Sequence, residues 1–143
     1  MKRFLLSLLI LVNVSIFSEQ FYADIEVKKI VSVYDGDTFR VDLDSIKYPD
    51  IIGKHISVRI ADIDTPELKS KNKDTKQLAI VSRDFSKKQL LSAKKIVLTK
   101  VRRDKYFRIL AVVLVDGVDL SKLLLDQKLA KLYSGGSKSG LWE

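Results

Sequence analysis

The sequence contains no cysteine and a single histidine, His55. Without cysteine the chain can form neither disulfides nor thiolate metal sites, and it cannot carry the cysteine-linked lipid of a lipoprotein. One histidine also argues against a zinc or copper site, because those metals favour imidazole and thiolate ligands. Any metal site in this chain would therefore be built from oxygen atoms.

Glycine and proline are scarce, with six and two residues among 143. The chain has neither internal repeats nor low-complexity tracts. Charged residues make up 31% and hydrophobic residues 46%, which is typical of a globular domain rather than a disordered chain. We therefore expect one domain with a substantial hydrophobic core.

The N-terminal stretch MKRFLLSLLILVNVSIFS has a short basic start followed by a mostly apolar run. This run is shorter than the roughly 20 residues of a membrane-spanning helix, and its layout is typical of a secretory signal peptide. We expect residues 1–23 to be a signal peptide, cleaved after Ser18 or Ala23, and residues 24–143 to form the domain. The protein would then be secreted or periplasmic, whereas an uncleaved N-terminus would anchor it in the membrane.

Hydrophobic periodicity predicts mainly β structure. TFRVDLD and HISVRIAD both alternate between apolar and polar residues, which is typical of strands with one wet face. In the second stretch Arg59 points away from the apolar side. The expected order is three strands, a helix, two strands and a helix, over residues 25–35, 38–44, 55–62, 77–94, 96–101, 107–115 and 118–133, with an exposed loop at 68–77.

Five short strands with a helix between the third and the fourth are the pattern of an oligonucleotide-binding (OB) barrel. The predicted fold class is thus α+β, mainly β, a five-stranded OB-fold barrel with two to three helices. The first helix is expected to face the core through Leu78, Val81 and Phe85. The second is expected to begin at an Asp119 cap.

The net charge is +8, yet carboxylates gather at two strand ends, in YDGDT and in VRIADIDTPE. If these ends adjoin in the sheet, Asp37 and Asp64 converge, and two such charges are costly unless a cation lies between them. Oxygen ligands favour Ca²⁺ over Mg²⁺ or Mn²⁺. Alternatively, both residues simply form turns. Carboxylates combined with Arg59 suit phosphoryl chemistry, and the basic charge suits a polyanionic partner.

Three motifs, VYDGDTFRV, VRIADIDTPE and DKYFRILAVVLVDG, in this order and with these separations, resemble the staphylococcal nuclease (thermonuclease) family. The resemblance extends from about Ile25 to Trp142. It implies an OB barrel and a Ca²⁺-dependent phosphodiesterase, a hydrolase that acts as an endonuclease on DNA and RNA and leaves 3′-phosphates. It implies no stable protein partner, so we expect a monomer whose contact with the membrane is limited to the signal peptide.

The resemblance also implies roles for the acidic residues. Asp37 and Asp64 match the metal-binding carboxylates, and Thr65 matches a residue that offers its backbone carbonyl to the metal. Asp35 would lie close by as support. Glu67 matches the proposed general base.

The remaining roles concern the substrate. Arg59 and Arg108 match two arginines that bind the phosphate. The resemblance implies that these two arginines and Glu67 are the catalytic residues. Tyr106 matches an aromatic hydroxyl near the phosphate, and Tyr133 a base-stacking tyrosine. Phe107 departs from the family, because a glycine usually stands there. The alternative function is a non-catalytic OB module that binds single strands, although such relatives usually lose the acids.

Overall fold

The computed structural model describes residues 20–138 and 141–142. Most of the expected signal peptide, residues 1–19, lies outside the described residues. None of the described helices is long and apolar enough to cross a membrane.

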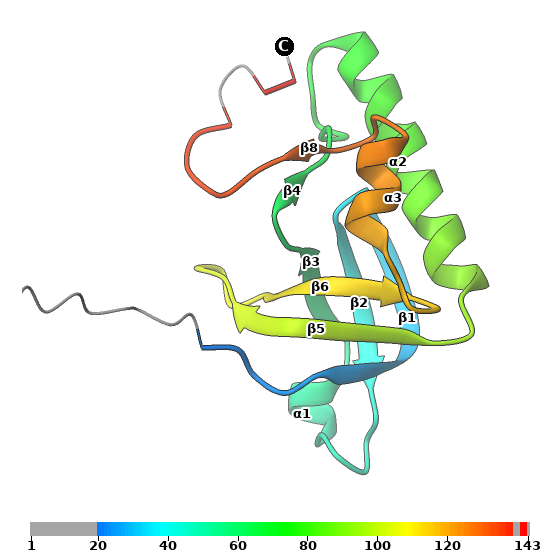
Figure 1. Cartoon of the computed structure of the whole chain (residues 1–143), viewed down its shortest axis with the longest axis vertical. Helices are drawn as coiled ribbons and strands as arrows, with labels where there is room; N and C mark the ends of the chain where they lie inside the picture. Colours follow the sequence, from blue (N-terminus) through cyan, green and yellow to red (C-terminus); the bar gives the residue numbers. More distant parts are fainter. Residues whose placement is uncertain (1–19, 139–140, 143) are drawn as a thin grey trace, which may run out of the picture.

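Five strands close into a barrel (Figure 1). Strands β1 (Ile25–Asp35), β2 (Thr38–Leu43) and β3 (Ile56–Ile60) form an antiparallel meander. Strands β5 (Ile96–Arg103) and β6 (Ile109–Val115) form a hairpin whose first strand pairs with β1. Parallel pairing of β3 with β6 closes the barrel. The predicted five-stranded OB-type barrel is therefore confirmed.

Short elements and three helices complete the described fold. The short strands are β4 (Ile63–Asp64), β7 (Val118–Asp119) and β8 (Lys131–Leu132), and the helices are α1 (Asp50–Gly53), α2 (Lys73–Ser92) and α3 (Leu120–Asp126). Helix α1 lies in the connection from β2 to β3. Helices α2 and α3 pack against each other, and each also packs against a barrel strand (Figure 1).

Helix α2 begins earlier than its hydrophobic pattern predicted. The side chain of Asn72 accepts hydrogen bonds from the backbone amides of Asp74 and Thr75, at 2.9 and 3.0 Å, and so caps the first turn. The loop expected over residues 68–77 consequently ends at Asn72.

The buried face of α2 also differs from the expected one. Leu78 and Phe85 are partly buried and pack against the core as expected, but Val81 is exposed. The fully buried positions are Ala79, Ser82, Ser86 and Leu90, so small side chains that hydrophobic periodicity does not register also contact the barrel.

The predicted second helix is correct at its start and too long at its end. The carboxylate of Asp119 accepts a hydrogen bond from the amide of Ser121 at 2.9 Å, as expected of a cap. The helix stops at Asp126, and Lys128 adopts a left-handed backbone with φ 56°, which no helix can continue. The chain then enters β8, which pairs with β4.

The core fills the barrel. It includes Phe39, Val41 and Leu43 from β2 and Val58 and Ile60 from β3, all buried as the alternation predicted. Strand β6 alternates between buried and half-buried residues. The polar faces of β2 and β3 are therefore free to build a site outside the core.

Candidate active site

The two acidic strand ends meet, as the sequence predicted. Thr38 pairs with Arg59 in the ladder between β2 and β3, and the amide of Ile60 donates to the carbonyl of Asp37 at 2.8 Å. This register brings Asp37, at the start of β2, beside Asp64, which follows β3. Both side chains are almost completely buried.

The guanidinium of Arg59 bridges the two carboxylates. Its Nη1 lies 2.9 Å from Oδ1 of Asp37, and its Nη2 lies 2.9 Å from Oδ1 of Asp64. Burial opposes the charged form of Arg59, but the two carboxylates outweigh burial and raise its pKa. Arg59 points away from the core, as predicted, and its partners are the acids of the site.

Asp37 is held by further donors. Thr38 Oγ1 donates to Asp37 Oδ1 at 2.8 Å, and the amide of Thr65 donates to Oδ2 at 3.0 Å. Burial nevertheless raises the pKa of Asp37, and the charge of Arg59 offsets only part of this effect. The pocket around Asp37 therefore favours additional positive charge.

Helix α2 fixes the turn that carries Asp37. Ser86 Oγ donates to the carbonyl of Gly36 at 2.5 Å, and Ser82 Oγ donates to the carbonyl of Leu129. A Cβ atom at Gly36 would overlap Ser82 Oγ. Glycine is therefore required here by close packing, and the serines missed by hydrophobic periodicity set the position of the acidic turn.

Two buried oxygens near this turn have no hydrogen-bond partner among the described residues, Asp35 Oδ1 and Thr65 Oγ1. Burial, followed by the charge of Asp37, raises the pKa of Asp35. Both residues line the same cavity. Buried polar atoms are normally paired, so these oxygens are available to an additional ligand.

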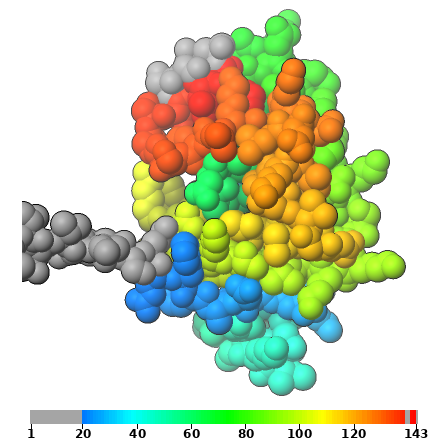
Figure 2. Space-filling model, in the orientation of Figure 1, coloured from blue at the N-terminus to red at the C-terminus, as the bar shows by residue number. Residues whose placement is uncertain are grey.

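That cavity measures about 840 Å³ and opens to solvent. In Figure 2 the segment around β4 is seen between the C-terminal segment and the β5–β6 hairpin. The cavity brings together all but one of the predicted site residues: Asp35, Asp37, Arg59, Thr65, Glu67, Tyr106, Arg108 and Tyr133. Asp64 lies behind the cavity wall and reaches it through its ion pair with Arg59.

Arg108 reaches the cavity from the β5–β6 hairpin. Its Nε lies 2.7 Å from Oδ2 of Asp104, whose Oδ1 accepts from the amides of Tyr106 and Arg108 at 2.8 and 3.0 Å. Burial opposes ionisation of Asp104, but these hydrogen bonds outweigh it and lower its pKa. Sequence reasoning missed Asp104, although an Asp four residues before an Arg in a polar connection is a detectable signal.

Phe107, at the tip of this hairpin, has a left-handed backbone with φ 61° and a side chain that is 82% exposed. This conformation explains why glycine suits the position. The carbonyl of Phe107 accepts a hydrogen bond from Arg103 at 2.6 Å. The ring of neighbouring Tyr106 is exposed, and the guanidinium of Arg108 lies 5.4 Å from its centre.

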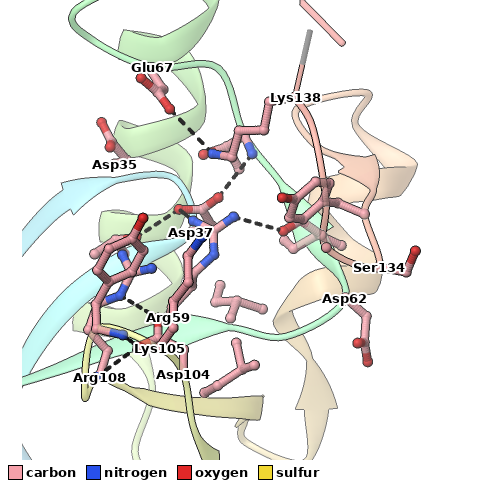
Figure 3. A pocket seen from close by; sticks show the side chains of 18 of the residues that line it. Asp35, Asp37, Arg59, Asp62, Glu67, Asp104, Lys105, Arg108, Ser134 and Lys138 are labelled. Carbon is pink, nitrogen blue, oxygen red and sulfur yellow. Dashed lines mark hydrogen bonds and ion pairs between the residues drawn. The ribbon is translucent and has the colours of Figure 1, made fainter.

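The C-terminal segment adds two residues, Lys138 and Trp142, whose contacts sequence reasoning did not predict. Lys138 Nζ lies 2.5 Å from Oδ1 of Asp64. It also lies 3.3 Å from Oε1 of Glu67, a pair drawn in Figure 3. Burial opposes its charge, but the hydrogen bond to Asp64 prevails and raises the pKa of Lys138. Trp142 donates its indole N–H to Oδ2 of Asp64 at 2.9 Å.

Tyr133 lies at the start of the same segment. Its hydroxyl donates to the carbonyl of Gly136 at 2.7 Å, and its ring centre lies 5.8 Å from Lys138 Nζ. The ring therefore supports the C-terminal segment as well as lining the cavity.

A model of the family described as "Staphylococcal nuclease homologue" matches residues 57–141. The chain belongs to the staphylococcal nuclease family. This confirms the resemblance seen in the three motifs. The chain is 33% identical over 110 residues to a thermonuclease of Staphylococcus hyicus, covering 76% of this chain and 57% of that protein. It is 36% identical over 115 residues to endonuclease YncB of Bacillus subtilis (strain 168), covering 73% and 49%. The chain thus spans about half the length of these relatives.

Proposed function

We propose that this protein is an exported, Ca²⁺-dependent endonuclease that hydrolyses phosphodiester bonds of DNA and RNA and leaves 3′-phosphates. The observation that carries the proposal is that Asp37 and Arg59 line one cavity together with Glu67 and Arg108, and that Arg59 also binds the buried carboxylate of Asp64. Membership of the family, and the nuclease names of its relatives, support it.

The donor chemistry of the site fits a hard cation. Carboxylate and carbonyl oxygens are the ligands that Ca²⁺ takes in proteins, and Asp35 Oδ1 is a buried carboxylate oxygen without a partner among the described residues. Among the described residues, no group of three or more acidic or histidine side chains is arranged so that it could hold a metal ion by itself, so the proposed site also needs the backbone carbonyl of Thr65. Arg59 and Lys138 supply the positive charge there.

Asp37, Asp64 and the backbone carbonyl of Thr65 would hold the cation. When bound, it would polarise the phosphate and make a water molecule a better nucleophile. Thr65 and both carboxylates are buried, and the hydrogen bond from the amide of Thr65 to Asp37 holds two of the three ligands together.

Glu67 would act on the attacking water. Its carboxylate is exposed at the cavity, where it can accept the proton as the water oxygen bonds to phosphorus. The bond from phosphorus to the 5′ oxygen then breaks, and that oxygen leaves with the electron pair and is protonated. Arg59 and Arg108 would stabilise the negative charge that grows on the phosphoryl oxygens.

The test is a cleavage assay on single-stranded DNA, double-stranded DNA and RNA, with Ca²⁺ or with a chelator. The proposal expects cleavage with Ca²⁺ and none with chelator, and end-group analysis should find 3′-phosphates. Equal cleavage in chelator would exclude the metal assignment. Binding without any cleavage in Ca²⁺ would favour the non-catalytic OB module.

Export through a signal peptide is part of the same proposal. Contacts made by Phe21 and Tyr22 indicate where that peptide would be cleaved. The amide of Tyr22 donates to the carbonyl of Val101 at 2.7 Å, and the ring of Phe21 lies 5.6 Å from the guanidinium carbon of Arg102. Cleavage after Ala23 would remove both contacts, so they support cleavage after Ser18. N-terminal sequencing of the exported protein tests this, and a mature chain that begins at Asp24 would contradict it.

A further inference from the structure

Lys138 occupies a distinctive place in the site. Its ammonium group contacts the carboxylates of both Asp64, a proposed metal ligand, and Glu67, the proposed base. The pair with Glu67 is drawn in Figure 3. The side chain of Asp64 is 1% exposed, so water screens its contact with Lys138 only weakly. The position of the ammonium is therefore one where positive charge is strongly favoured.

Every carboxylate oxygen of the two proposed metal-binding aspartates already has a hydrogen-bonding or ionic partner. The partners are Thr38, Arg59 and the amide of Thr65 on Asp37, and Arg59, Lys138 and the indole of Trp142 on Asp64. Oδ1 of Asp64 already has two cationic partners, Arg59 and Lys138, so a metal ion that binds through Asp64 meets positive charge already in place. Binding thus requires that some of this charge withdraw.

Among these partners, Lys138 is the one best able to withdraw. The side chain of Arg59 is only 12% exposed and bridges two acids, whereas that of Lys138 is 36% exposed. Lys138 also follows Gly135 and Gly136, whose φ angles of 100° and 94° mark a backbone that can rearrange easily.

The end of the segment is fastened independently of Lys138. The carbonyl of Trp142 accepts from Thr75 Oγ1 at 2.8 Å, and Lys131 Nζ donates to the carbonyl of Leu141 at 2.6 Å. The ammonium group of Lys131 also lies 4.5 Å from the centre of the Trp142 ring. The ammonium of Lys138 can therefore leave Asp64 while Trp142 stays in place.

We propose that Lys138 is an internal counter-cation that competes with the divalent metal for Asp64 and Glu67, and so determines the metal affinity of the site. This inference rests on the proposed function, because it needs the metal site to exist. Lys138 would then also determine which cations the site selects. A monovalent ion binds weakly and would not displace an ammonium group that is already attached to the chain. Before metal binds, Lys138 keeps the acidic cluster neutralised and folded.

The test measures Ca²⁺ binding by titration calorimetry on the whole protein without nucleic acid. We compare the wild type with Lys138→Gln and Lys138→Arg. Lys95→Gln is the matched control, because it removes the same charge from a surface pair with Glu26 outside the cavity. Lys138→Gln should bind Ca²⁺ about tenfold more tightly, the scale of one close charge pair. Lys138→Arg and Lys95→Gln should stay near the wild-type affinity.

Thermal unfolding gives a second readout. In chelator, Lys138→Gln should unfold at a lower temperature than the wild type, because Asp64 loses a buried ionic partner. Saturating Ca²⁺ should remove the difference. A purely structural lysine would leave the variant less stable in both conditions, and that result would overturn the inference.

The outcomes separate the two proposals. If neither the wild type nor Lys138→Gln binds Ca²⁺, the metal site fails, and the inference fails with it. If both bind with equal affinity, or if Lys138→Gln binds more weakly, the inference is wrong while the proposed nuclease stands.

Discussion

Arg59 and Arg108 line the same cavity but are held in different ways. Arg59 lies on β3, and its guanidinium is fixed between two aspartates whose side chains are 3% and 1% exposed. Arg108 follows the β5–β6 turn and is paired with one aspartate, Asp104, beside an exposed tip. The same proposed role, binding a phosphate, is thus built once into the barrel and once onto a peripheral hairpin.

Because the two arginines are held differently, we expect their loss to affect stability to different extents. Removing Arg59 leaves two buried carboxylates without their shared partner, so its loss should affect folding as well as activity. Removing Arg108 leaves Asp104, which keeps two backbone donors. We therefore expect loss of Arg59 to lower both stability and turnover, and loss of Arg108 to lower turnover with little effect on stability.

The largest expected effect is on Arg59. Arg59→Met should lower the free energy of unfolding by about 3–5 kcal/mol in chelator, the scale for breaking a buried ion pair. Chemical denaturation measures this, and Ca²⁺ should restore part of the loss by supplying charge to Asp37 and Asp64. A loss below about 1 kcal/mol, the range of exposed pairs, would remove the distinction between the arginines.

For Arg108 the expected effect lies in turnover. Arg108→Lys keeps the charge but loses the bidentate fork that matches a phosphate. Turnover should fall by about 10²–10³, the range for losing a donor to a transition-state oxyanion, with little change in unfolding free energy or nucleic-acid affinity. If affinity falls as much as turnover, Arg108 binds the ground state and not the transition state.

Asp104 should behave as a positioning residue for Arg108. Asp104→Asn keeps an acceptor for the backbone amides but loses the ionic partner of Arg108, so turnover should fall about tenfold while substrate affinity is kept. The pH dependence has a defined sign. Because the pKa of folded Asp104 lies below its ordinary 3.8, the ion pair stabilises the fold fully above about pH 5 and is lost as the pH falls through the folded-state pKa. Asp104→Asn should flatten this part of the stability curve; an unchanged curve would contradict the assignment.

The smallest expected effect concerns the tip of the hairpin. Phe107 has a left-handed backbone, which costs residues other than glycine about 1 kcal/mol, and its side chain buries little surface. Phe107→Gly should therefore stabilise the protein by about 0.5–1 kcal/mol. Phe107→Ala keeps the strained backbone and should change little, so a similar gain in both variants would point to the side chain instead.

The positions of Asp37 and Asp64 could be predicted from the sequence, because both residues lie next to the ends of strands that the alternating pattern reveals. Alternation located β2 and β3 and therefore brought Asp37 and Asp64 together. The serine face of α2 could not be predicted in this way. Its close contact with Gly36 depends on small polar side chains, which carry no hydrophobic signal.

The contacts of the C-terminal segment were also beyond prediction. They depend on where the last helix stops, and leucines that continue past Asp126 favour a longer helix. The left-handed Lys128 and the pairing of β8 with β4 turn the chain back across the site instead. Lys138 and Trp142 reach Asp64 only as a result of that turn, so neither their partners nor the charge balance of the cluster is visible in the sequence.

The most direct test of the account compares turnover and equilibrium binding of the wild type and Glu67→Gln, with Ca²⁺ and salt fixed. Glutamine keeps the shape of the side chain but cannot accept the proton of the attacking water. The account predicts that turnover falls by about 10² or more, the scale of general-base catalysis, while nucleic-acid affinity is unchanged or slightly improved by the loss of a negative charge. A variant that cleaves as fast as the wild type would contradict the catalytic role of Glu67.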